Sequence, residues 1–124
     1  MNARALGPYV RAWAERFRAQ EHARERRAAQ ARAVLPRLVR HLVERYGARR
    51  IWLFGSLADG AFGEGSDIDL AAEGLPAGPA AFRAAAELDD LARPFGVDLV
   101  PLEDAHPPLR ARIVDRGELL HGSA

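Results

Sequence analysis

The chain has 124 residues, 48% of them hydrophobic, a formal net charge of +1 and no cysteine. This length and composition correspond to one domain with a real core, and the lack of cysteine excludes a disulfide framework and any thiolate metal site. No run of about 18 apolar residues occurs, which excludes a membrane-spanning helix, and the first residues lack the apolar core of a secretory signal, so we expect a soluble cytoplasmic protein.

The basic residues, all of them arginine, are concentrated in the first part of the chain. Residues 1–50 hold 13 Arg against four acids, whereas residues 51–124 hold five Arg against 13 acids. This asymmetry predicts either attraction between the two parts or an acidic partner for the first part. Direct binding to nucleic acid is disfavoured, because the interleaved aromatic residues that single-strand binders use are sparse here.

The first predicted element is a long helix over residues 9–33. Val10, Trp13 and Phe17 recur at helical spacing and form one stripe. Beyond Phe17 the stripe fades into Ala, Arg, Glu and Gln, which favour a helix but bury little. Such a segment either stands in solvent or packs on a partner, and the sequence leaves both alternatives open.

A proline interrupts this pattern and divides the chain. Pro36 either kinks the helix or lies in the first turn of a second one. The second helix is predicted from a clear apolar face that ends before Gly47, made of Leu38, Val39, Leu42, Val43 and Tyr46. We therefore divide the chain into an N-terminal helical extension, residues 1–33, and a domain, residues 34–124.

The rest of the chain predicts strands alternating with helices. The segment "RIWLF" at Arg50–Phe54 is rich in β-formers and precedes Gly-Ser, so it is predicted to be a buried strand. The further predicted elements are a strand in "SDIDLAAEG", a helix over residues 79–92, a strand from Val97 to Pro101, a helix over about residues 108–116 and a short final strand in "GELLHG". This order predicts an α/β (α+β) fold, with a small mixed sheet and flanking helices.

Three aspartates are predicted to share one face of that sheet. Asp67 and Asp69 are one residue apart in the second strand, so both point the same way, opposite to the apolar Ile68 and Leu70. Two adjacent carboxylates repel each other unless a cation lies between them, and such oxygen ligands suit Mg²⁺ or Mn²⁺. Asp98 has apolar neighbours in the third strand and joins the pair if the second and third strands are adjacent. Three carboxylates on one face can hold two divalent ions.

The Gly-Ser pair after the first strand predicts a phosphate site. A strand that ends in Gly-Ser and enters a helical turn presents free backbone N–H groups, and Gly55 lets a phosphate approach the backbone. Ser56 adds a hydroxyl donor. The predicted nucleotide-binding residues are Gly55, Ser56 and Ser66. A phosphate site beside a metal cluster is the equipment of phosphoryl or nucleotidyl transfer.

The stretch "FGSLADGAFGEGSDIDL" resembles the motif of the minimal nucleotidyltransferases, the MNT proteins of the polymerase-β-like superfamily. The resemblance rests on the pattern GS-x10-DxD and covers about residues 34–120. It implies a nucleotidyltransferase fold in which the Gly-Ser pair holds the triphosphate of ATP. It further implies that Asp67 and Asp69 bind two Mg²⁺ and that Asp98 completes the site.

The resemblance also implies a partner and an activity. Many such proteins are antitoxins encoded beside a HEPN ribonuclease toxin, and some transfer AMP from ATP to a tyrosine of that toxin. It therefore implies an Mg-dependent protein adenylyltransferase that acts on a HEPN-type toxin. The alternative is an idle antitoxin that neutralises a toxin by binding alone, whereas the short chain disfavours transfer to a small molecule.

One position departs from the family pattern. Family members often have Arg where this chain has Asp59, so a cation that meets phosphate or partner there is missing. The arginine-rich N-terminal helix either supplies that positive charge or docks the partner. A hetero-oligomer and a homodimer both remain open.

Overall fold

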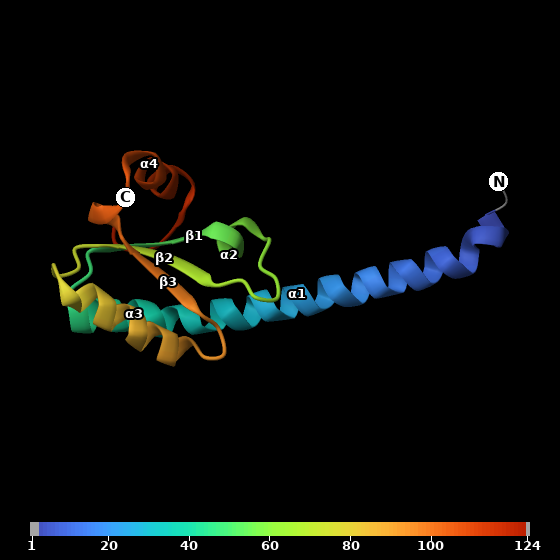
Figure 1. Cartoon of the computed structure of the whole chain (residues 1–124), viewed down its shortest axis with the longest axis horizontal. Helices are drawn as coiled ribbons and strands as arrows, with labels where there is room; N and C mark the ends of the chain where they lie inside the picture. Colours follow the sequence, from blue (N-terminus) through green and yellow to red (C-terminus); the bar gives the residue numbers. More distant parts are fainter. Residues whose placement is uncertain (1–2, 124) are drawn as a thin grey trace.

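The structure is a computed structural model that describes residues 3–123. Its helices are α1 (Ala3–Tyr46), α2 (Gly55–Asp59), α3 (Pro79–Ala92) and α4 (Pro107–Arg116), with a short 3-10 helix η1 (Leu102–Asp104). Its strands are β1 (Arg50–Phe54), β2 (Ile68–Glu73), β3 (Val97–Pro101) and β4 (Glu118–His121). Figure 1 shows one small sheet with helices on both faces. The N-terminal part of α1 projects beyond this body.

The four strands form a mixed sheet in the order β3-β2-β1-β4. The inner strand β1 is antiparallel to both β2 and β4, whereas β2 and β3 are parallel. Parallel neighbours need a crossover connection, and α3 provides it between β2 and β3. The predicted mixed sheet with flanking helices is therefore confirmed.

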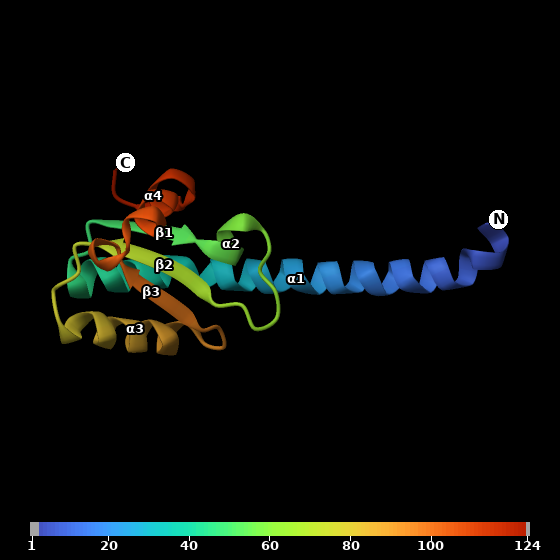
Figure 2. The ribbon, with the colours of Figure 1, turned by 45° about the horizontal axis from the view of Figure 1, so that its top comes forward.

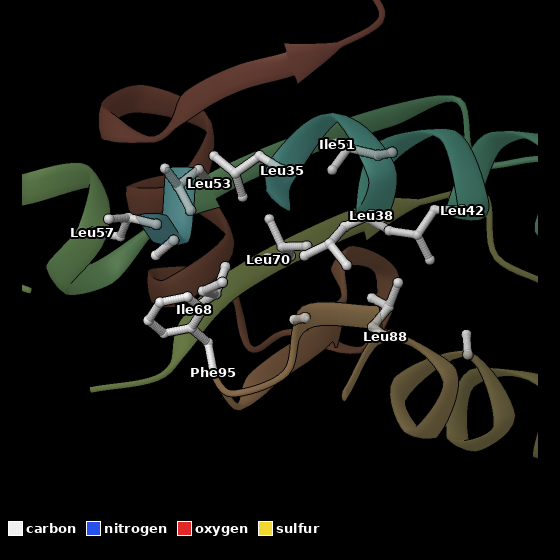
Figure 3. Packing of buried hydrophobic residues seen from close by; sticks show 14 of the residues in the cluster. Leu35, Leu38, Leu42, Ile51, Leu53, Leu57, Ile68, Leu70, Leu88 and Phe95 are labelled. Atoms are coloured by element: carbon white, nitrogen blue, oxygen red, sulfur yellow. The ribbon is translucent and has the colours of Figure 1, made fainter. Parts of the chain in front are cut away.

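The main core lies between one face of the sheet and the helices α1 and α3. Ile51, Leu53, Ile68 and Leu70 point to this face and are fully buried. Figure 3 shows leucine side chains of α1 lying over these residues. The opposite face carries a smaller buried cluster, in which Trp52 and Ala71 of the sheet pack with Leu102 of η1 and Ile113 of α4.

Of the two alternatives for Pro36, the start of a second helix is wrong, because α1 is one helix of 44 residues with Pro36 inside it. Pro36 is exposed, so its ring lies on the solvent side. A proline within a helix costs about 3 kcal/mol because a hydrogen bond is lost. Buried leucines on both sides of Pro36, such as Leu35 and Leu38, offset that cost by packing on the sheet. The division of the chain into an extension, residues 1–33, and a domain, residues 34–124, stays a prediction.

The N-terminal part of α1 extends past the rest of the molecule (Figures 1 and 2). We call residues 3–23 the projecting arm. Tyr9, Val10, Trp13 and Phe17 on this arm are 78%, 55%, 61% and 50% exposed, and the Trp13 and Phe17 rings stack with their centroids 5.5 Å apart. The arm ends where Arg24 donates to the carbonyl of Ala61 at 3.5 Å. The predicted stripe is therefore present but uncovered.

Among residues 3–123, none of the helices combines the length and the apolar character needed to cross a bilayer.

Candidate active site

Two of the predicted acidic residues are neighbours across parallel strands. Asp69 of β2 is the register partner of Asp98 of β3 and, on its other side, of Phe54 of β1. Register partners in adjacent strands point to the same face of a sheet. This face is the one that carries α4, since Ile68 and Leu70 point to the other. Asp69 is half-buried, whereas Asp98 is exposed on the edge strand.

Asp67 precedes β2 by one residue and is exposed. Its carboxylate lies against the backbone of Gly96, at the entry to β3, so closely that a Cβ on Gly96 would overlap Oδ1 of Asp67. The negative charges of Asp67 and Asp98 both act on Asp69. The structure thus brings the three aspartates to the same end of the sheet.

The ionisation of Asp69 reflects these surroundings. Its pKa is raised from an ordinary value of 3.8 to about 6, chiefly because burial disfavours the charged form, and further because Asp98 and Asp67 repel it. Burial and the two other acids disfavour the charged form of Asp69. A cation bound among the three carboxylates therefore stabilises that charged form. The electrostatics of this end of the sheet therefore favour a bound cation.

The donor set suits a hard divalent ion, because three carboxylates are the ligands that Mg²⁺ prefers. Within the part of the chain that the structure describes, however, no three Asp, Glu, His or Cys side chains are already grouped closely enough to hold a metal ion. Asp67 and Asp98 are exposed, so their side chains are free to change rotamer. The residues fit Mg²⁺ by their chemistry, and their role as ligands stays a prediction.

The Gly-Ser turn lies directly against Asp69. Gly55 follows β1 and begins α2 with φ 73°, a left-handed conformation that side chains disfavour. A Cβ on Gly55 would overlap Oδ2 of Asp69. Glycine is therefore required here both by the backbone conformation and by the approach of the carboxylate. Ser56 is half-buried, and its carbonyl closes the turn by accepting from Ala61 at 2.9 Å.

Ser66 is engaged within its own loop. Its hydroxyl oxygen accepts from the backbone N–H of Gly63 at 3.0 Å, and its own N–H donates to the Gly63 carbonyl at 3.0 Å. These two bonds shape the loop that leads into β2. The structure gives Ser66 a role in positioning Asp67, and its predicted contact with nucleotide stays a prediction.

A pocket of about 330 Å³ lies next to this site and was missed by the sequence analysis. Gly55 and Asp59 line it from α2, and Arg112 and Arg116 line it from α4. The two arginines are four residues apart, which places them on one face of a helix. That spacing was visible in the sequence, but no local pattern showed that this face of α4 meets the Gly-Ser turn.

Comparison with known proteins agrees with this geometry. A family model described as "Polymerase beta, Nucleotidyltransferase" matches residues 38–124. No curated protein sequence matches the chain significantly. The matched residues include the Gly-Ser turn, the three aspartates and α4, whereas the projecting arm lies outside the match.

Solved structures of toxin–antitoxin complexes contain similar chains. A chain in a toxin–antitoxin structure with AMP-PNP is 30% identical, with a TM-score of 0.61 and 73% of each chain covered. A chain in the structure of a tri-AMPylated Shewanella oneidensis HEPN toxin in complex with MNT antitoxin is 28% identical, with a TM-score of 0.53, and the alignment covers 72% of this chain and 67% of that one. A chain of the MntA–HepT toxin–antitoxin is also 28% identical, with a TM-score of 0.52, 72% of this chain and 68% of that one covered.

Proposed function

The chain belongs to the polymerase beta nucleotidyltransferase family, and from this premise we propose that it is an MNT-type antitoxin that transfers AMP from ATP to a tyrosine of a HEPN-type toxin. The observation that carries the proposal is the meeting of Gly55 with Asp69, next to Asp98 and Asp67, at one end of the sheet. The similar chains come from complexes that contain AMP-PNP or an AMPylated HEPN toxin, which supports both the nucleotide and the partner.

Each residue of the site has a role in this proposal. Asp67, Asp69 and Asp98 hold two Mg²⁺, and Gly55 and Ser56 contact the triphosphate. A divalent ion held by these carboxylates would neutralise the charge that develops on the phosphate oxygens during transfer. The glycine keeps the backbone free of a side chain, so that phosphate and carboxylate can lie close together.

The transfer replaces a phosphoanhydride bond of ATP by a phosphodiester linkage to tyrosine. The tyrosine oxygen forms a bond to the α-phosphorus of ATP, while the bond from that phosphorus to the oxygen shared with the β-phosphate breaks. AMP remains on the tyrosine, and pyrophosphate leaves. Asp98 accepts the proton of the tyrosine hydroxyl, and its position on the exposed edge strand leaves it open to an incoming protein.

The proposal is tested with the HEPN-type protein encoded beside this one. The purified pair is incubated with Mg²⁺ and ATP labelled at the α-phosphate, with wild-type chain, with Asp67→Ala or with Asp90→Ala. Asp90 is an exposed acid on α3 that pairs only with Arg93 among the described residues, so it serves as the control. We expect label on a toxin tyrosine with the wild type and with Asp90→Ala. Label that persists with Asp67→Ala contradicts the mechanism.

Neutralisation by binding alone is the second candidate. Two observations favour it, namely the uncovered aromatic residues of the projecting arm and the acid Asp59 beside the Gly-Ser turn. It predicts that Asp67→Ala still inhibits the toxin when ATP is absent. Inhibition that requires both ATP and Asp67 contradicts it.

A further inference from the structure

The pocket between α2 and α4 has a largely apolar lining that carries two arginines and one aspartate. Arg112 and Arg116 of α4 line it opposite the turn that contains Gly55 and Asp59, and Phe54 is among its apolar lining residues. We propose that this pocket binds the terminal phosphates of the nucleotide, with Arg112 and Arg116 as their cationic ligands. This inference rests on the proposed function, because it concerns how the same nucleotide is held.

The two guanidinium groups are available to a ligand. Both side chains are exposed, and within residues 3–123 neither takes part in an ion pair or a side-chain hydrogen bond. Arg110 of the same helix is different, because it donates to the carbonyls of Leu102 and Glu103 at 3.1 and 2.8 Å and so fastens α4 to η1. Guanidinium groups bind phosphate in a bidentate manner, and two of them one turn apart suit adjacent phosphate groups.

Gly55 connects the pocket to the aspartates. It lines the pocket and also lies against Oδ2 of Asp69. A polyphosphate that begins at the carboxylates can therefore reach the arginines by way of Gly55, which borders both groups. A volume of about 330 Å³ is at the lower end for ligand pockets, which suits part of a nucleotide rather than all of it.

The charge of the surroundings makes these arginines necessary. A polyphosphate at this site faces the three aspartates and also Asp59, an acid on the wall of the pocket itself. Like charges that lie close together repel one another. Cations among the aspartates neutralise the negative charge at one end of the polyphosphate. Arg112 and Arg116 neutralise the charge at the end that lies in the pocket.

The test measures nucleotide binding by the full chain alone, with no toxin present. Dissociation constants for AMP-PNP and for AMP are determined with Mg²⁺ by calorimetry for the wild type, Arg112→Gln, Arg116→Gln and the double variant. We expect each single change to weaken AMP-PNP binding about 10-fold and the double change about 100-fold. AMP has no terminal phosphates, so its affinity should change less than about 2-fold. Arg37→Gln, an exposed change on α1, controls for net charge.

Each outcome has a distinct meaning. A double variant that binds AMP-PNP like the wild type overturns the inference and leaves the proposed function standing. Equal weakening of AMP and AMP-PNP, with an unchanged melting temperature, also overturns it, because the pocket would then hold the nucleoside. Arg116→Lys, which keeps the charge, should retain more AMP-PNP affinity than Arg116→Gln. A wild type that binds neither nucleotide overturns both the inference and the proposed function.

Discussion

Replacing Asp69 by Asn is expected to make the metal-free protein more stable at pH 7 while it abolishes AMP transfer. The pKa of Asp69 is raised to about 6 by burial and by the charges of Asp98 and Asp67, so the ionised carboxylate opposes folding at pH 7. Asn keeps the shape and removes the charge. Because Asp69 is only half-buried and partly screened by water, we expect a gain of about 1–2 kcal/mol, or about 3–8 °C in melting temperature.

The activity should change in the opposite direction. If Asp69 is a ligand of the metal ions, its loss removes charge stabilisation from the transition state. A decrease of about 1000-fold or more is expected, which corresponds to about 4 kcal/mol. Added Mg²⁺ should raise the melting temperature of the wild type but much less that of Asp69→Asn, which gives a readout that is independent of transfer.

The stability gain depends on pH with a definite sign. Below the ordinary pKa of 3.8, Asp69 is protonated in both the folded and the unfolded chain and costs nothing. As the pH rises from about 4 to about 6, the unfolded chain loses this proton first, so the folded wild type loses stability relative to the variant. Above about 6 the difference is constant. Urea unfolding of both proteins across this range checks the prediction, and a difference that does not grow with pH contradicts it.

Replacing Gly55 by Ala is expected to abolish transfer, whereas the same change at Gly47 should leave it intact. The two glycines have almost the same conformation, with φ of 73° and 72°, so each substitution forces a side chain into the left-handed region at a cost of about 1–2 kcal/mol. Their surroundings differ. At Gly47 no atom lies within 4 Å of the new Cβ, but at Gly55 the Cβ overlaps the carboxylate of Asp69.

The carboxylate must therefore move in Gly55→Ala, and with it the predicted ligand of the metal ions. We expect transfer to fall at least about 100-fold, since small displacements of groups that position a reaction have effects of this size. Gly47→Ala isolates the backbone cost. Melting temperatures and transfer rates of both variants are compared, and Gly55→Ala with wild-type transfer would show that Asp69 need not lie against this turn.

Local sequence patterns predicted the elements that carry the site. The bounds expected for Arg50–Phe54, residues 79–92 and Val97–Pro101 coincide with β1, α3 and β3. Glycine or proline marks an end of each, as Gly55 follows β1 and Pro79 begins α3. These residues act through the backbone, so their influence is readable without knowledge of the fold.

The features of the fold and the site that could not be predicted from the sequence depend on contacts between distant elements. The expectation that Asp98 joins Asp69 was conditional on β2 and β3 being neighbours, and the parallel pairing in the structure meets that condition. The continuity of α1 through Pro36 depends on packing against the sheet, which overrides the local cost. The place of Arg112 and Arg116 depends on the docking of α4 beside β1, for which no nearby residue is a signal.

The projecting arm has a consequence for the exchange of backbone amide hydrogens. Its peptide hydrogen bonds are supported only by the helix itself, whereas those around Ala31 and Leu38 lie beneath buried side chains. In proteins most of the stability of a helix comes from tertiary packing, which the arm lacks among the described residues. Deuterium uptake measured by mass spectrometry should be at least about 100-fold faster in residues 9–20 than in residues 31–46. Slow uptake by the arm of the isolated chain would contradict this, and retardation that appears only after a HEPN protein is added would locate that protein on Trp13 and Phe17.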